Sequence, residues 1–180
     1  MNQVYINIGK PVTLFWVLFG LTVLAIIGMQ VTGAPLKTVA APGGIVTFEL
    51  IGTLEGSREI MNSWQGVVMT YAGINMGLDF LFLTLYGITI ALGCMIVSDK
   101  LPANMVMLKQ LGVWLAAAVL FAALLDVIEN IALIKLLLGS QNTMLPMLAK
   151  WCAIPKFVLV LLALLYPVGG LIVNSRKPQS

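Results

Sequence analysis

Four long apolar segments restrict the folds that this chain can adopt. They cover residues 11–31 (PVTLFWVLFGLTVLAIIGMQV), 78–97, 111–138 and 154–173. Each segment meets or exceeds the roughly 20 residues that an α-helix needs to cross about 30 Å of hydrocarbon. The sequence therefore predicts an all-α fold, a four-transmembrane-helix bundle that forms a single integral membrane domain over residues 1–180.

The composition agrees with a membrane protein and excludes several classes of site. The chain is 60% hydrophobic and 9% charged, whereas soluble domains contain about 25% charged residues. Its formal charge of +3 is scattered, so it predicts no nucleic-acid partner. Histidine is absent, which excludes histidine-ligated haem, zinc and copper and all histidine-dependent triads. Cys94 and Cys152 fit no metal-binding spacing, so we predict no metal and no cofactor.

The basic residues suggest an orientation in the membrane. The first apolar segment is longer than the 7–15-residue core of a signal peptide, so we expect it to remain as a helix. Positive residues favour the cytoplasmic side. The side with the termini carries more of them, so we expect both termini to be cytoplasmic. That side carries Lys10, Lys100, Lys109, Arg176 and Lys177, against Lys37, Arg58 and Lys150 on the other side.

The loop from about residue 32 to residue 77 is the only sizeable segment outside the predicted spans. Its richness in Ile, Val, Phe, Trp and Met argues against a disordered linker. Ser57 is a suitable N-cap, and Ile60, Met61 and Trp64 follow at helical spacing on one face. The loop therefore predicts a short amphipathic helical segment, which either lies at the membrane interface or covers the bundle.

The third apolar segment carries polar residues in its middle. In LLDVIENIALIKLLL, residues 124–138, Asp126 is followed by Glu129 and Asn130 at the i+3 and i+4 positions. All three side chains therefore share one helix face. Small residues continue this face toward Gly112, which favours close packing against other helices over contact with lipid.

The other predicted helices supply complementary groups at similar depth. Asp79 opens the second predicted helix, Tyr86 lies two turns later, and Lys156 follows Pro155 at the start of the fourth. With a rise of about 1.5 Å per residue, these groups reach the outer half of the bilayer beside the polar face. Two carboxyls one turn apart repel each other, so at least one should be protonated or paired with Lys156. The loop around Glu49 is placed to cover the resulting acidic pocket.

Several segments resemble a group of small bacterial four-helix membrane proteins for which no activity is established. The similarity lies in the loop Phe-Glu-Leu of GIVTFELIGTLEGSREIMNSW, in LDFLFLTLYG, in the Asp-x-x-Glu-Asn of LLDVIENIALIK and in IPKFVLVLLALLY. The resemblance covers most of residues 45–166. It implies that six residues belong together, which are Glu49, Asp79, Asp126, Glu129, Asn130 and Lys156. We expect the protein to lie in the bacterial inner membrane.

The sequence leaves three functions open. The first is a pocket that binds or translocates a lipid, an amphipathic cation or a proton. The second is an accessory or scaffold subunit that binds a membrane-protein partner or another copy of the chain, with the polar residues serving only as a helix clamp. The third is a lipid-modifying enzyme with a buried carboxyl as general acid or base, although no activated nucleophile is evident. The candidate ligand-binding residues are Asp126, Glu129, Asn130, Asp79, Tyr86, Lys156 and Glu49.

Overall fold

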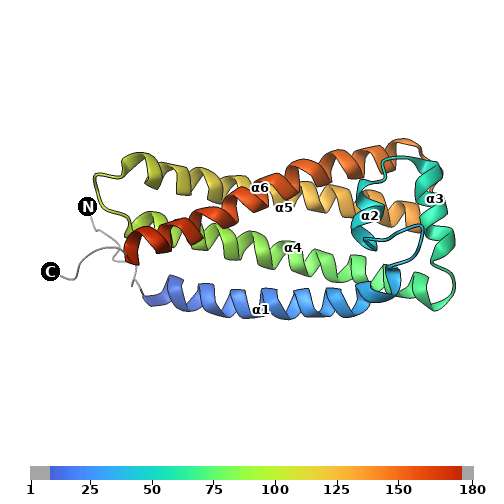
Figure 1. Cartoon of the computed structure of the whole chain (residues 1–180), viewed down its shortest axis with the longest axis horizontal. Coiled ribbons are helices and arrows are strands. Elements are labelled where there is room, and N and C mark those ends of the chain that lie inside the picture. Colours follow the sequence, from blue (N-terminus) through green and yellow to red (C-terminus); the bar gives the residue numbers. More distant parts are fainter. Residues whose placement is uncertain (1–8, 176–180) are drawn as a thin grey trace, which may run out of the picture.

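The structure, a computed structural model, describes the backbone of residues 9–175 and the side chains of residues 11–170. It is all-α, with no strand in this part of the chain, as predicted. Arg176 and Lys177, used above to predict orientation, lie outside the described residues. The elements are α1 (Gly9–Gly33), the 3-10 helix η1 (Ala34–Leu36), α2 (Ile45–Leu50), α3 (Leu54–Ser63), α4 (Val67–Lys100), α5 (Val106–Leu137) and α6 (Met144–Ser175) (Figure 1).

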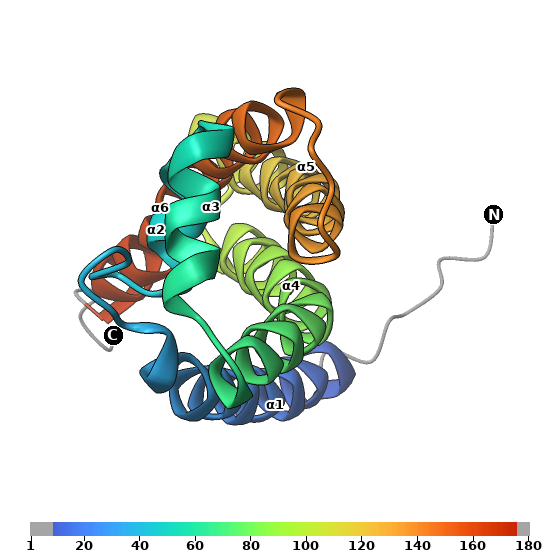
Figure 2. The ribbon, with the colours of Figure 1, turned by 90° about the vertical axis from the view of Figure 1, so that its right-hand side faces the viewer.

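The four long helices run antiparallel in chain order and form an arc. In this arc α4 packs between α1 and α5, and α5 packs against α6 (Figure 2). Each long helix holds a segment long and apolar enough to cross a membrane. Large apolar side chains such as Phe121, Leu124 and Ile128 of α5 point outward and remain exposed, as expected of a surface that contacts lipid. The chain is therefore an integral membrane protein with a four-helix bundle.

The segment between α1 and α4 folds over one end of the bundle (Figures 1 and 2). Trp64 at the end of α3 is completely buried, and its indole nitrogen donates a hydrogen bond of 2.8 Å to the Leu36 carbonyl. The ring of Phe48 from α2 packs edge-on against it, with 5.3 Å between the ring centroids. Helix α2 in turn packs against α6. This arrangement makes α2 and α3 a cap on the bundle, which agrees with the second of the two placements predicted for the loop.

The cap helix α3 begins earlier than the sequence suggested. Its N-cap is Thr53, whose hydroxyl accepts a hydrogen bond of 3.3 Å from the Gly56 amide. Ser57 lies inside the helix and donates its hydroxyl to the Thr53 carbonyl, so its predicted N-cap role is wrong. Both residues have capping side chains, and the backbone of Thr53 is extended, as an N-cap requires. The predicted amphipathic face is confirmed, because Ile60 and Trp64 are buried.

Helix α4 begins at Val67, although the sequence predicted a start at residue 78. The prediction began the helix where the continuous apolar run begins, and the glycines before residue 78 lower helix propensity. Tertiary contacts compensate for them. Asn75 is buried and donates hydrogen bonds of 2.9 Å to the Met29 carbonyl and 2.8 Å to the Thr32 hydroxyl of α1. Asp79 therefore lies inside α4 and not at its start.

Helix α6 begins at Met144, ten residues before the predicted start. The side chain of Asn142 accepts a hydrogen bond of 2.9 Å from the Met144 amide, and Pro146 occupies the first turn, where its missing N–H costs nothing. Pro155 lies in the helix interior, so its predicted position in the first turn is wrong. Lys156 therefore also lies well inside its helix.

Candidate functional site

Lys156 is the centre of a buried polar cluster near the capped end of the bundle. Its ammonium nitrogen lies 2.8 Å from Glu129 Oε2 and 3.0 Å from Asp126 Oδ1, both on α5. Glu49 Oε2 of α2 is 3.9 Å away, which is too far for a hydrogen bond. The same nitrogen lies 4.7 Å from the ring centroid of Phe157. The lysine therefore holds α5 and α6 together directly and attracts α2 more weakly.

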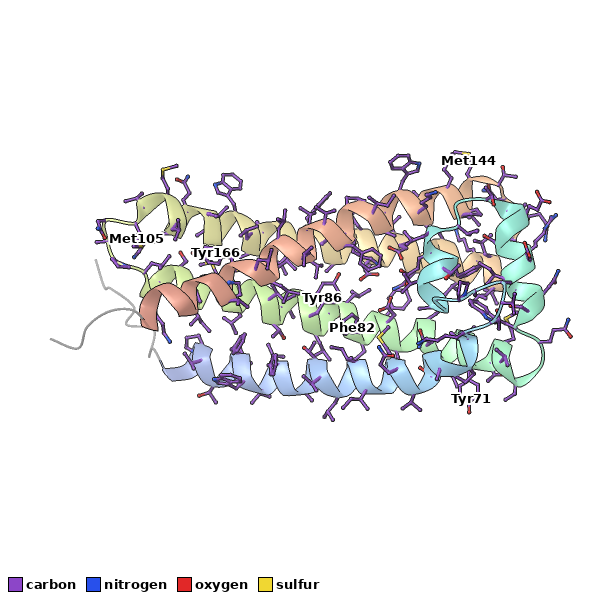
Figure 3. The ribbon with its side chains drawn as sticks, in the orientation of Figure 1. Tyr71, Phe82, Tyr86, Met105, Met144 and Tyr166 are labelled. Carbon is purple, nitrogen blue, oxygen red and sulfur yellow. The ribbon has the colours of Figure 1, made fainter. Side chains whose placement is uncertain are left out.

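Two hydrogen bonds extend the cluster to α4. The Tyr86 hydroxyl donates to Asp126 Oδ2 at 2.9 Å, so Asp126 receives a phenol on one oxygen and an ammonium group on the other. The amide of Asn130 donates to Asp79 Oδ2 at 2.6 Å. Tyr86 also packs against Phe82 one turn earlier, and both point from α4 into the bundle (Figure 3). All seven residues predicted from the sequence therefore belong to one neighbourhood.

The cluster contains more acidic groups than basic ones. Each of its four carboxyls and its single lysine is at most 7% exposed. In the described part of the chain, Lys156 is the only residue that forms ion pairs with these carboxyls. Uncompensated charge is costly at such low exposure. The cluster should therefore hold protons or receive additional positive charge from a ligand.

Some oxygens in the cluster lack hydrogen-bond donors. Within the described residues, no group donates to Glu49 Oε2, Glu129 Oε1 or the side-chain oxygen of Asn130. A buried acceptor without a donor normally costs about 1–3 kcal/mol. These atoms can therefore accept hydrogen bonds from a proton, a water molecule or a ligand.

Glu49 is the acidic residue of the cluster that lies outside the membrane-spanning helices. Burial raises the pKa of its carboxyl well above its usual range. The ammonium group of Lys156 opposes this rise, and the neighbouring carboxyls of α4 and α5 reinforce it. The folded protein therefore holds the Glu49 proton more tightly than the unfolded chain does.

This difference predicts a pH dependence of stability. An unfolded glutamate loses its proton near pH ~4.3, whereas folded Glu49 loses it at higher pH. Between these two pH values the folded state binds more protons than the unfolded state, so stability should fall as pH rises. The equilibrium constant for unfolding should increase by up to about tenfold per pH unit. Thermal melts across this range should show a smaller fall in Glu49→Gln than in the wild type. The exposed acid Glu55 supplies the control Glu55→Gln, and equal slopes in all three proteins would contradict the prediction.

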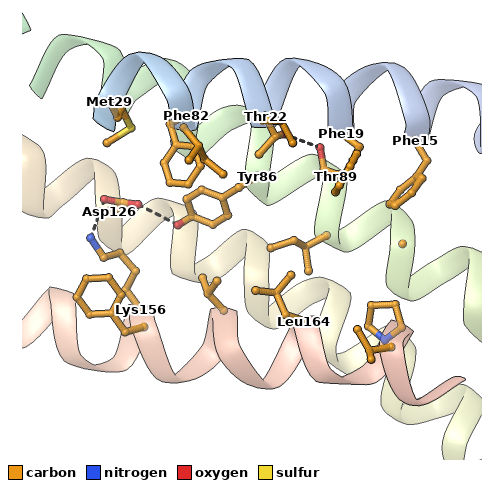
Figure 4. Close-up of a pocket in the computed structure, with 18 of the residues that line it drawn as sticks. Phe15, Phe19, Thr22, Met29, Phe82, Tyr86, Thr89, Asp126, Lys156 and Leu164 are labelled. Carbon is orange, nitrogen blue, oxygen red and sulfur yellow. Dashed lines mark hydrogen bonds and ion pairs between the residues drawn. The ribbon is translucent and has the colours of Figure 1, made fainter. Parts of the chain in front are cut away.

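A cavity of about 710 Å³ adjoins the cluster (Figure 4). Glu49, Asp79, Tyr86, Asp126 and Lys156 line it where the cluster lies, and elsewhere apolar side chains of α1, α4 and α6 form its walls. Its lining includes Phe15, Phe19 and Met29 of α1, Phe82 and Ile90 of α4, and Val160, Leu164 and Val168 of α6. The cavity thus combines a long hydrocarbon surface with one strongly polar region.

The cavity is not sealed from the surroundings of the bundle. Helices α1 and α6 both line it, yet α1 packs mainly against α4, and α6 mainly against α5. Trp16 of α1 and Leu164 and Val168 of α6 line the cavity and are still 62%, 44% and 57% exposed. The space between α1 and α6 therefore leads from the cavity toward the membrane side of the bundle.

Sequence reasoning missed the part of the site that α1 supplies. Thr22 of α1 and Thr89 of α4 both line the cavity, and their hydroxyl oxygens lie 3.2 Å apart (Figure 4). The available signal was Thr22, the polar residue inside the apolar run LFWVLFGLTVLAIIGM of residues 14–29. Lys100 also lines the cavity, at the end of α4 far from the cluster. The described residues contain no group of three acids or cysteines arranged to hold a metal ion.

No family model, curated protein or solved structure matches this chain. The resemblance to small bacterial membrane proteins therefore stays a prediction.

Proposed function

We propose that this protein binds a single-chain amphiphile taken from the membrane. In this proposal the headgroup lies at the cluster around Lys156 and Asp126, and the hydrocarbon chain lies along the cavity between α1, α4 and α6. The proposal rests chiefly on one observation, the continuity of a buried polar cluster with a long apolar cavity. A helix clamp alone would explain the ion pairs, but it would not require the adjoining cavity.

The dimensions of the cavity agree with one hydrocarbon chain. Its lining along α6 extends from Lys156 to Val168. At 1.5 Å per residue this corresponds to roughly 18 Å. Half of a bilayer core of about 30 Å is roughly 15 Å, which is the depth that one lipid chain spans. A chain of this length would contact the aromatic and aliphatic side chains throughout the cavity.

The open side of the cavity supports entry from the bilayer. A lipid chain that passes between α1 and α6 would stay in apolar surroundings throughout, so it would not have to cross water. The cap formed by α2 and α3 covers the end of the bundle near the cluster and limits the access of water there. Binding of the polar headgroup would then satisfy oxygens that have no donor in the free protein.

A substitution that fills the cavity tests the proposal. Leu164→Trp places a large ring in the cavity, whereas Leu165→Trp makes the same change on the same helix at an exposed position outside the cavity lining. Each protein is reconstituted in lipid nanodiscs, and saturable binding of radiolabelled tetradecylamine and tetradecanol is measured against empty nanodiscs. We expect the Leu164→Trp variant to weaken binding at least tenfold, because the added indole occupies the volume of the chain.

Leu165→Trp should bind both probes like the wild type. If neither probe binds the wild-type protein saturably, or if both tryptophan variants bind as well as the wild type, the amphiphile proposal is wrong. Circular dichroism of the reconstituted variants checks that the helices remain folded.

A further inference from the structure

We infer that the headgroup of the bound amphiphile is a cation, of the size of a primary ammonium group, which exchanges with protons held by the acidic cluster. This inference rests on the proposed function and specifies its ligand. It follows from the charges that face the polar region of the cavity, from a buried carboxyl of its lining that has no hydrogen-bond donor, and from the aromatic rings beside it.

The polar region of the cavity carries more acidic groups than basic ones. Helix α1 contributes no ionisable group to the cavity lining. The remaining elements contribute four carboxyls, one phenol and one ammonium group near the polar region, and Lys100 lines the cavity far from it. These groups are Glu49 of α2, Asp79 and Tyr86 of α4, Asp126 and Glu129 of α5, and Lys156 of α6, with the thiol of Cys152 on α6 close to the charges of Glu129 and Lys156.

Two of the carboxyls remain available to a ligand. Lys156 makes short contacts only to Asp126 and Glu129. Glu49 lines the cavity at 6% exposure, and its Oε2 has no hydrogen-bond donor among the described residues. Asp79 also lines the cavity, with one oxygen bound to an uncharged amide. Two carboxyls on different elements therefore face the cavity without a hydrogen bond from an ammonium group, since Lys156 comes no closer than 3.9 Å to Glu49. A primary ammonium group has three N–H donors to offer them.

The aromatic side chains favour the same ligand. Phe82, Tyr86 and Phe157 line the cavity beside the acids, and Lys156 already lies 4.7 Å from the ring centroid of Phe157. The negative faces of such rings attract cations and repel anions. An anionic headgroup would add negative charge to a site already rich in carboxyls, and a neutral one would not displace their protons.

The exchange follows from the cost of buried charge. Without ligand, the surplus carboxyls are neutralised by protons. When the ammonium group enters, a carboxylic acid releases its proton to water, and the resulting carboxylate forms an ion pair with the cation. The net charge of the site is then unchanged, so binding of the cation should become tighter as pH rises.

The experiment compares three probes of equal chain length on the wild-type protein in nanodiscs. Tetradecylamine is cationic, because alkylammonium groups lose their proton only near pH ~10.4. Tetradecanol is neutral and tetradecyl sulfate is anionic. After subtraction of binding to empty nanodiscs, we expect the amine to bind at least tenfold more tightly than the alcohol and the sulfate to bind weakest. Between about pH 6 and about pH 8 the affinity for the amine should rise by up to about tenfold per unit, and the affinity for the alcohol should stay constant.

Two substitutions test the acids that face the cavity. Asp79→Asn keeps an oxygen acceptor for Asn130, and Glu49→Gln keeps the shape of its side chain. Each should weaken amine binding about tenfold and leave alcohol binding unchanged. Glu59→Gln removes the same charge from an exposed position of the cap and should change neither amine binding nor alcohol binding.

The outcomes separate this inference from the proposed function. If amine and alcohol bind equally well, or if the sulfate binds best, the cation inference is wrong and the amphiphile proposal stands. Amine binding that does not change with pH overturns the exchange with protons. If no probe binds saturably, the proposed function itself is wrong.

Discussion

Lys156→Met should lower the stability of the folded protein by about 3–5 kcal/mol near neutral pH. Methionine has a similar length and an apolar surface, so the substitution removes the charge with little change in packing. The carboxyls of Asp126 and Glu129 would lose the counter-charge at 3.0 and 2.8 Å while remaining almost completely buried. Most of the lost stability comes from the buried carboxylates that are left without a counter-charge, and less comes from the lost contacts of the lysine side chain. Unfolding by a denaturing detergent in mixed micelles measures the effect.

Acidification should reduce the loss caused by Lys156→Met, because protonated carboxyls need no counter-charge. The double variant Lys156→Met/Glu129→Gln should likewise recover part of the stability. Lys135→Met supplies the control, since Lys135 lies exposed near the end of α5, and should change stability by less than about 0.5 kcal/mol. A Lys156→Met protein as stable as the wild type at neutral pH would show that the ion pairs do not hold the cluster together.

Trp64→Ala should destabilise the protein by about 3–5 kcal/mol, the usual cost of removing a large buried aromatic ring. The ring of Trp64 is completely buried, packs against Phe48 and donates a hydrogen bond to the Leu36 carbonyl. Removal leaves a hole in the cap and an unpaired carbonyl. Because α2 carries both Phe48 and Glu49, loosening of the cap should also admit water to the acidic cluster.

Trp64→Phe separates the two contributions of this side chain. Most of the ring packing remains and only the hydrogen bond is lost, so the cost should be about 1 kcal/mol. Hydrogen exchange of the backbone amides in residues 45–63 should increase strongly in Trp64→Ala and slightly in Trp64→Phe. Unchanged exchange in both variants would mean that Trp64 does not anchor the cap.

The sequence by itself determined the features that depend on local pattern. Four apolar runs define four membrane helices, because the length of an apolar segment can be counted directly in the sequence. The spacing of Asp126, Glu129 and Asn130 places them on one face of a helix, and the small residues on that face direct it inward. The expected pairing of these acids with Lys156 also followed from its position along the chain.

Only the tertiary structure decided where α4 begins and what surrounds the cluster. Helix α4 extends beyond its predicted start because contacts such as those of Asn75 with α1 compensate for weak local propensity. The α1 wall of the cavity, the donation from Tyr86 to Asp126 and the approach of Glu49 to Lys156 join residues that are distant in sequence. Such contacts arise from the packing of whole helices, and no local periodicity encodes them.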